Sequence, residues 1–244
     1  MTLTVDVRAA DAPTVLITGS SRGIGLELAR NYAERGWTVI ATCRNPAKAL
    51  DLQAIRKSYP NVTIEALDVT DGQAIHALAA AYKSTPIDVL INNAGISGDD
   101  QSQVFGEFRY EVYNQVHAVN VLGPLRMAEA FIDHVAASNQ KKIINITSTM
   151  GSIASTRGRN YFYRSSKTAL NMVMRTLSVE LRKKDVTVGL ISPGFVKTDF
   201  TKGMDFPMMI TARESATAVI GIIDDYSLDK TGTFMRHNGE EAPW

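Results

Sequence analysis

Short runs of β-branched and aliphatic residues alternate with longer amphipathic segments along almost the whole chain. Six runs have the length and composition of strands; they are residues 14–18, 37–42, 62–67, 87–92, 142–147 and 186–191. The intervals hold helical patterns such as residues 26–35 (LELARNYAER), which stop at Gly36. Because repeated strand–helix–strand units with right-handed crossovers build a parallel sheet covered by helices on both faces, the sequence predicts a doubly wound α/β fold.

The length of the chain favours a single domain. Its 244 residues fit one α/β domain, and no repeat or linker interrupts the alternation. We expect residues 13–244 to form this domain and residues 1–12 to be an N-terminal extension. That extension carries Asp6, Arg8 and Asp11 where a signal peptide needs apolar residues. Since no run approaches the ~18 apolar residues of a membrane span, we expect a cytoplasmic protein that does not bind a membrane.

Charge and cysteine content argue against two further classes of protein. The formal net charge of +1 gives no sign of a nucleic-acid partner. The basic residues 182–184 fall where a helix should end, and cations there offset the helix dipole. The single cysteine, Cys43, cannot form an internal disulfide and lies in an apolar run, so we expect it to be a small core residue. No metal site is expected.

A glycine-rich turn follows the first strand. Residues 18–25 (TGSSRGIG) lead directly into a helical pattern, so the glycines can form a tight turn while the helix N-terminus offers free N–H groups to a pyrophosphate. The spacing GxxxGxG differs from the GxGxxG of the standard fingerprint. Its position between the first strand and the first helix nevertheless predicts a dinucleotide site in a Rossmann fold.

The end of the second strand indicates which dinucleotide binds. In NAD sites a carboxylate at this place binds the ribose 2′-hydroxyl, but residues 41–45 read ATCRN, with Arg44 and no acid. An arginine suits a 2′-phosphate, and Arg22 in the glycine turn could hold the phosphate from the other side. The alternative is that both arginines are solvated loop residues. We predict NADP(H) as the cofactor.

Two tyrosines precede a lysine in residues 160–171 (NYFYRSSKTALN). Lys167 follows Tyr163 by four residues, a spacing that places both side chains on one face of a helix. A neighbouring ammonium favours the phenolate and lowers a tyrosine pKa from its usual ~10 toward neutrality. A chance pair on an amphipathic helix is the alternative, so the other motifs must decide.

Five motifs in order resemble the short-chain dehydrogenase/reductase family across residues 13–244. They are the glycine turn, NNAG at 92–95, Ser148 after the fifth strand, YxxxK at 163–167 and SPGFVKT at 192–198. More narrowly, residues 163–171 (YRSSKTALN) and 231–244 (TGTFMRHNGEEAPW) look like the branch of the C-factor and sniffer-like carbonyl reductases.

The resemblance implies four catalytic residues: Asn120, Ser148, Tyr163 and Lys167. Tyr163 would protonate the carbonyl oxygen, Lys167 would lower the pKa of Tyr163, and Ser148 would hydrogen-bond the same oxygen. The interval from Ser148 to Tyr163 is two residues longer than is common in the family, and the common interval would fall on Tyr161. We choose Tyr163 because it alone has a lysine four residues later, and because residues 151–159 can hold the two extra residues.

Asn120 would support a water that relays protons to the lysine. Pro124, four residues later in a helical run, has no N–H, so the carbonyl of residue 120 loses its helical partner and can hold a water. A kink at Gly123 and Pro124 that serves only packing is the alternative.

The resemblance also implies the residues that hold the cofactor. They are Gly19, Ser21, Arg22, Gly23, Ile24, Gly25, Arg44, Asp68, Val69, Asn93, Ala94, Gly95, Tyr163, Lys167, Pro193, Gly194, Val196 and Thr198. Among them, Asp68 would contact the adenine, although an aspartate after a strand is also an ordinary helix cap. Lys167 would hold the nicotinamide ribose.

The segment after the sixth strand is irregular and rich in methionine. Gly203 and Pro207 interrupt it, and its place beyond the carboxyl end of a strand predicts a substrate lid near residues 199–212; a plain connection is the alternative. Its apolar side chains, Met204, Phe206, Met208, Met209 and Ile210, indicate an apolar substrate.

These residues together favour an oxidoreductase that transfers hydride from NADPH to the carbonyl carbon of an aldehyde or ketone, with the reverse alcohol oxidation. One alternative is a nucleotide-binding signalling protein of C-factor type with little turnover. Another, a nucleotide-sugar epimerase, would need a larger substrate domain. We expect a homodimer or homotetramer, because the apolar side of residues 169–177 can pair across a twofold axis, although it can equally cover the sheet.

Overall fold

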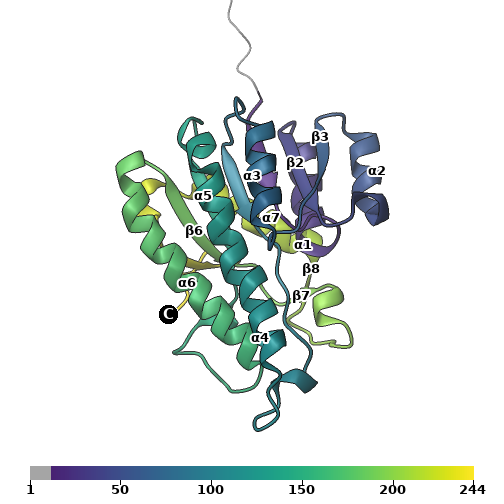
Figure 1. Ribbon diagram of the computed structural model, residues 1–244, viewed down its shortest axis with the longest axis vertical. Helices are drawn as coiled ribbons and strands as arrows, with labels where there is room; N and C mark the ends of the chain where they lie inside the picture. Colours follow the sequence, from purple (N-terminus) through teal and green to yellow (C-terminus); the bar gives the residue numbers. More distant parts are fainter. Residues whose placement is uncertain (1–11) are drawn as a thin grey trace, which may run out of the picture.

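A seven-stranded parallel sheet forms the centre of the protein (Figure 1). The computed structural model describes residues 12–244, so residues 1–11 of the expected N-terminal extension lie outside the described residues. The strands are β1 (Thr14–Ile17), β2 (Thr38–Cys43), β3 (Val62–Ala66), β4 (Val89–Asn92), β5 (Lys142–Ile146), β6 (Thr187–Ser192) and β9 (Phe234–Arg236). Their order is β3-β2-β1-β4-β5-β6-β9, and every neighbouring pair is parallel. The predicted doubly wound α/β fold is confirmed.

Helices cover both faces of this sheet. One face packs against α1 (Gly23–Glu34), α2 (Leu50–Ser58) and α7 (Ala212–Asp225). The other packs against α3 (Gly72–Ala81), α5 (Gly123–Ala136) and α6 (Tyr161–Leu181), with α4 (Tyr110–His117) leading into α5 (Figure 1). None of the helices in residues 12–244 is long and apolar enough to cross a membrane.

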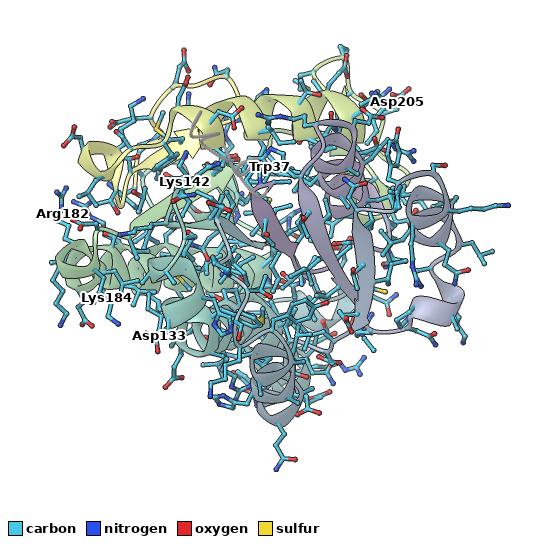
Figure 2. All side chains as sticks on the ribbon, turned by 90° about the horizontal axis from the view of Figure 1, so that it is seen from above. Trp37, Asp133, Lys142, Arg182, Lys184 and Asp205 are labelled. Atoms are coloured by element: carbon cyan, nitrogen blue, oxygen red, sulfur yellow. The ribbon has the colours of Figure 1, made fainter. Side chains whose placement is uncertain are left out.

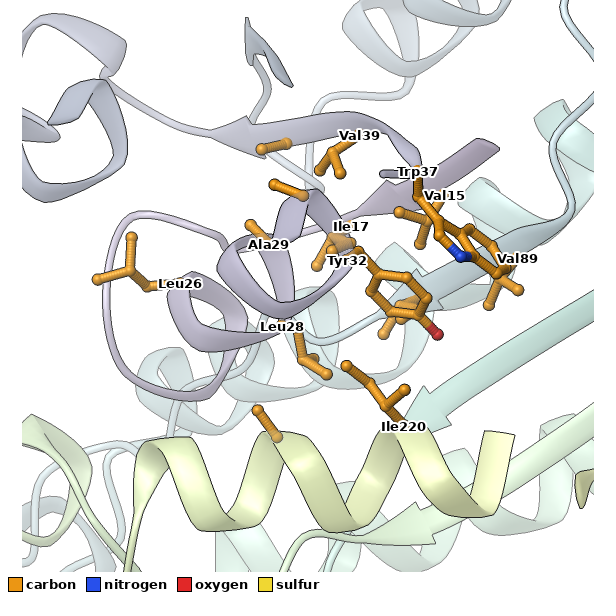
Figure 3. Packing of buried hydrophobic residues seen from close by; sticks show 14 of the residues in the cluster. Val15, Ile17, Leu26, Leu28, Ala29, Tyr32, Trp37, Val39, Val89 and Ile220 are labelled. Carbon is orange, nitrogen blue, oxygen red and sulfur yellow. The ribbon is translucent and has the colours of Figure 1, made fainter. Parts of the chain in front are cut away.

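Alternation along β1 supplies both cores. Val15 and Ile17 face the α1 side, and Leu16 between them faces the α3 side, as the period of two in a strand requires. In the first core, Tyr32 of α1 stacks against Trp37 with ring centroids 4.7 Å apart, and Ile220 of α7 closes the layer (Figure 3).

The six predicted strands match observed strands to within two residues at each end. The α1 helix ends at Glu34, and Gly36 then adopts a φ of +78°, the left-handed conformation that glycine allows after a helix. Cys43 is buried at the end of β2, as expected. The short strand β9 and the two-residue strands β7 (Val196–Lys197) and β8 (Ile210–Thr211) were not predicted, because two or three residues carry no periodicity.

Two lysines, Lys142 and Lys184, connect neighbouring elements (both are labelled in Figure 2). Lys142 is buried at the start of β5, and its Nζ donates to the carbonyl oxygen of Ile223 at 2.6 Å near the end of α7. Nζ of Lys184, in the basic turn that follows α6, lies 3.3 Å from Oδ1 of Asp133 in α5. The basic residues 182–184 thus have the helix-end position that the sequence predicts.

The apolar side chains of α6 lie on two faces of the helix, one packed in the core and one exposed. Leu170 and Met174 are buried in the core beneath the helix, whereas Met172 and Val179 are each about two-thirds exposed. One of these faces therefore covers the sheet, which was one of the two expected roles.

Candidate active site

Tyr163 and Lys167 lie in the first turns of α6. The helix begins at Tyr161 after Asn160, which has a left-handed φ of +53°. Its second residue, Phe162, donates its N–H to Oε1 of Gln103 at 2.8 Å, which fixes the start of the helix. The Nζ of Lys167 lies 5.7 Å from the centre of the Tyr163 ring. The four-residue spacing thus brings the two side chains together.

Tyr161 is turned toward a different part of the surface. Its ring packs edge-on against Phe108, with centroids 5.0 Å apart, and the residue is 45% exposed. Of the two tyrosines, Tyr163 therefore has the lysine neighbour.

Ser148 follows β5 and faces the phenol. Its Oγ accepts the N–H of Met150 at 3.1 Å, and it also hydrogen-bonds Tyr163. Burial raises the pKa of Tyr163 to about 12, although the hydrogen bond with Ser148 acts in the opposite direction. The net shift is therefore upward, whereas the sequence predicted a downward shift caused by Lys167, which is not among the causes. Spacing alone could not reveal that Tyr163 is partly buried.

The Lys167 ammonium is directed below the phenol, toward β5. Its Nζ donates to the carbonyl oxygen of Ile146 at 2.8 Å, and the residue is only 4% exposed. Burial lowers the pKa of Lys167 to about 8, because a charged amine loses hydration there. A Cβ built at Gly95 would lie 3.4 Å from Oδ1 of Asn120 and 3.7 Å from this Nζ. The absence of a side chain at Gly95 thus leaves room above both polar groups.

Asn120 lies in a π-helical turn, Ala118–Leu122, in which the N–H of Gly123 bonds the carbonyl of Ala118. The irregularity falls directly before Pro124, where the sequence predicts a break. The buried side chain of Asn120 accepts from the N–H of Ile96 at 2.9 Å and donates to its carbonyl at 2.8 Å. The carbonyl-bound water proposed for Asn120 stays a prediction.

Ser166 is a supporting residue that the sequence did not indicate. Its Oγ accepts from Nδ2 of Asn120 at 2.9 Å and donates to the carbonyl of Tyr163 at 2.8 Å. It therefore joins the π-helical turn to the first turn of α6. Its place between Tyr163 and Lys167 was the one available signal.

The glycine turn is fastened to the loop after β4. Gly19 has a φ of +72°, and a Cβ there would lie 2.8 Å from the Cα of Ala94. A Cβ at Gly25 would overlap the carbonyl oxygen of Gly19 and Nδ2 of Asn93. That Nδ2 donates to the carbonyls of Thr18 and Gly19 at 2.9 and 3.1 Å. These close approaches require glycine at both positions, and α1 begins directly after the turn, as in a site where a helix N-terminus binds a pyrophosphate.

The two predicted phosphate-binding arginines lie on exposed loops. Arg22 pairs with Asp199 at 3.5 Å, with about 70% of each side chain exposed. Burial pushes the pKa of Asp68 upward, but hydrogen bonds from the N–H and hydroxyl of Thr70, with the charge of nearby Arg44, hold it below its ordinary value. Arg44 thus lies close to the predicted adenine-contacting acid, whereas Arg22 faces the loop after β7.

The remaining predicted cofactor residues surround the same edge of the sheet, at the carboxyl ends of the strands. Ser21, Gly23 and Ile24 lie at the glycine turn and the start of α1, Val69 after β3, Pro193 and Gly194 after β6, and Val196 in β7. A Cβ at Gly23 would lie 3.4 Å from Cγ2 of Thr198. The segment after β6 therefore reaches back to the glycine turn.

A loop between β7 and β8 (198–209) covers the phenol. The ring of Phe200 lies 5.3 Å from that of Tyr163, and Lys197 and Asp205 are joined by a 3.2 Å ion pair (Asp205 is labelled in Figure 2). Met204, Phe206 and Met208 of this loop are each about half exposed or more, whereas Met209 is buried.

Comparisons with known proteins agree with this geometry. Residues 13–206 match the family described as short chain dehydrogenase. C-signal of Myxococcus xanthus is 36% identical over 70% of this chain and 100% of its own length. The 1-hydroxy-2-glutathionyl-2-methyl-3-butene dehydrogenase of a Rhodococcus species is 34% identical over 95% of this chain and 99% of its own.

Two solved structures are similar over nearly the whole chain. NADPH-bound carbonyl reductase from chicken fatty liver has a TM-score of 0.89 and 31% identity, covering 96% of this chain and 99% of that one. Carbonyl reductase Sniffer of D. melanogaster has a TM-score of 0.86 and 29% identity, covering 96% and 100%.

Proposed function

The chain belongs to the short-chain dehydrogenase family of oxidoreductases, and we propose that it reduces the carbonyl group of an aldehyde or ketone with NADPH. The observation that carries this proposal is the meeting of Ser148, Tyr163, Lys167 and Asn120 at the carboxyl end of β5. The similarity to a carbonyl reductase with bound NADPH supports the same reaction.

Tyr163 is the proposed general acid. Because burial raises its pKa to about 12, the phenol keeps its proton near neutral pH. It can then donate this proton to the carbonyl oxygen of the substrate while the carbonyl carbon accepts a hydride. Ser148, which already hydrogen-bonds the phenol, is placed to donate to the same oxygen. The reduced nicotinamide supplies the hydride when it is bound.

Lys167 is the proposed source of the replacement proton. An amine whose pKa is lowered to about 8 exchanges protons readily near neutral pH. Asn120 is held by Ile96 and Ser166 and is proposed to position a water beside the lysine. In alcohol oxidation Tyr163 must first lose its proton, and positive charge near its ring, from Lys167 or an oxidised nicotinamide, would favour the phenolate.

The glycine turn and the end of β2 are proposed to hold NADP(H). The close approaches at Gly19 and Gly25 leave backbone N–H groups for the pyrophosphate, and Arg44 suits a 2′-phosphate. Arg22 would have to exchange its exposed pairing with Asp199 for the phosphate, and such an exposed pair contributes little stability.

An apolar aldehyde or ketone suits the surroundings of Tyr163. The β7–β8 loop, which we propose as a lid, contributes Phe200, whose ring lies 5.3 Å from that of Tyr163. We also propose a homodimer or homotetramer, since Met172 on the outer face of α6 is exposed and apolar.

A panel of aldehydes, ketones, diketones and quinones, assayed by NADPH consumption, tests the proposed reaction. We expect carbonyl-dependent consumption with at least one class, and slower reaction with NADH. The similarity to C-signal keeps a second candidate, a nucleotide-binding signalling protein with little turnover. NADPH binding without consumption across the panel would favour that candidate and contradict ours.

A further inference from the structure

A hollow with three arginines lies beside the proposed active site. Its volume is about 400 Å³, enough for part of a small ligand. The lining residues are Thr149, Met150, Ser155, Arg157, Arg164 and Arg236. None of these is acidic, and two carry hydroxyl groups. The proposed reaction makes no use of the arginines.

The hollow adjoins the proposed catalytic residues along two chain segments. Thr149 directly follows Ser148 and Arg164 directly follows Tyr163, and consecutive Cα atoms are only about 3.8 Å apart. A hydrogen bond gives a third link, because the N–H of Thr149 donates to Oγ of Ser192 at 3.1 Å. Ser192 pairs in register with Arg236 across β6 and β9. The hollow and the proposed catalytic residues therefore share two chain segments, the one after β5 and the first turn of α6.

The positive charge of the hollow is only partly balanced. Within residues 12–244 the one ion pair that its arginines make is between Arg236 and Glu240, at 3.2 Å. Arg164 is held by neutral carbonyl oxygens of Arg159 and Met150, at 3.1 and 3.4 Å. Three guanidinium groups that line one hollow repel one another, and a bound anion would relieve that repulsion.

We propose that this arginine hollow binds the carboxylate or phosphate end of an anionic carbonyl substrate whose reacting carbonyl lies at Ser148 and Tyr163. Guanidinium groups form paired, charge-assisted hydrogen bonds with both kinds of anion. The hydroxyls of Thr149 and Ser155 are further donors beside them. The inference rests on the proposed function and adds that the substrate is amphipathic: an apolar body beside Phe200 and an anionic end in the hollow.

Matched substrates test the inference. We would compare ω-oxo carboxylic acids of increasing chain length with their methyl esters at saturating NADPH, and measure the ratio of kcat/KM for acid to ester. The ratio should exceed one at the length that spans the two sites. Arg157→Gln and Arg236→Gln should each lower it about tenfold, the loss of one charge-assisted hydrogen bond, mainly through KM for the acid.

Arg159→Gln is the matched control, because Arg159 is exposed on the same loop but does not line the hollow. It should leave the ratio unchanged. Inorganic phosphate should compete with the acids and not with the esters. A matching series of ω-oxo alkyl phosphates distinguishes a phosphate end from a carboxylate end. The series whose kcat/KM depends more strongly on the arginines identifies the preferred anion.

A wild-type ratio of one or less at every length, or equal effects of Arg157→Gln and Arg159→Gln, would overturn the inference. Calorimetric binding of the acids to the NADPH-loaded protein, with and without Arg157→Gln, gives a readout that needs no turnover. Failure of both acids and esters to react, with arginine-dependent binding retained, would contradict the proposed reaction and leave the anion site supported.

Discussion

The ring of Phe200 lies against the ring of Tyr163, with centroids 5.3 Å apart and planes inclined by 57°. Phe200 belongs to the β7–β8 loop and is itself 46% exposed, and its ring covers part of the phenol of the proposed general acid. Since burial is the main cause of the raised pKa of Tyr163, the protonation of the phenol depends on a residue of the proposed lid.

Phe200→Ala should lower the pKa of Tyr163, because it admits water to a phenol whose pKa burial raises to about 12. Alcohol oxidation requires the phenolate, so the limb of its pH profile on which the rate rises with pH should move to lower pH. The pH profile of oxidation measures this shift. Phe206→Ala is the control, because Phe206 packs on Phe195 at 5.7 Å instead. An unshifted profile for Phe200→Ala would mean that the loop does not shield the phenol.

Tyr163→Phe should lower turnover by at least the ~100-fold typical of a lost general acid, with NADPH binding nearly intact. Tyr161→Phe should keep more than half of the activity, because its ring packs on Phe108 and lies outside the proposed constellation. Steady-state kinetics and cofactor titration check both variants. Reversed results would transfer the role of acid to Tyr161.

The stability contributed at Lys167 should rise with pH. Burial lowers the pKa of Lys167 to about 8, so between pH 8 and the ordinary lysine value the unfolded chain binds more protons than the folded one. Stability therefore increases with pH in this window. Relative to wild type, the unfolding free energy of Lys167→Met should fall by up to about 3 kcal/mol as pH rises through it.

Urea unfolding at several pH values measures that difference. Lys184→Met, which removes a partly exposed lysine of a surface ion pair, is the control. A constant difference for Lys167→Met would show that the buried amine is not the titrating group.

Arg44→Asp should weaken NADPH and improve NADH, because it repels a 2′-phosphate and offers an acceptor to the ribose hydroxyls. One charge-assisted hydrogen bond corresponds to roughly tenfold or more in preference. The ratio of kcat/KM with the two cofactors, at one ionic strength, is the measurement. Arg182→Asp makes the same charge change at the far end of α6 and should leave the ratio alone. A wild-type preference for NADH would contradict the proposed role of Arg44.

Pro124→Ala should slow turnover with little change in cofactor affinity. It restores an N–H that can convert the π-helical turn Ala118–Leu122 to α-helix, which would rotate Asn120 away from Ile96 and Ser166. Turnover and NADPH titration are the measurements. Turnover equal to wild type would show that the π-helical turn serves packing alone.

Sequence patterns predicted the features that lie within a short stretch of the chain. The strand runs, the glycine turn and the spacing of Tyr163 and Lys167 each lie within a few consecutive residues, and the structure contains each of them. Spacing does not specify burial, so the direction of the Tyr163 pKa shift was predicted wrongly.

Contacts between segments that are distant in the sequence could not be predicted from its patterns. The bond from Asn120 to Ser166 requires the π-helical turn to pack on α6, and the pairing of Arg22 with Asp199 requires the β7–β8 loop to return to the glycine turn. The arginine hollow likewise draws on β9, which is too short to recognise.

The pairing of β1 with β4, across a sequence interval that contains β2 and β3, imposes an order on biosynthesis. A nascent chain that ends at β3 has its glycine turn but lacks Asn93, whose amide holds the carbonyls of Thr18 and Gly19. Closing so long an interval is slow compared with forming a helix. We therefore expect nucleotide affinity to arise only once β4 (Val89–Asn92) has docked, so that the dinucleotide stabilises chains that extend beyond β4 and not the shorter fragments.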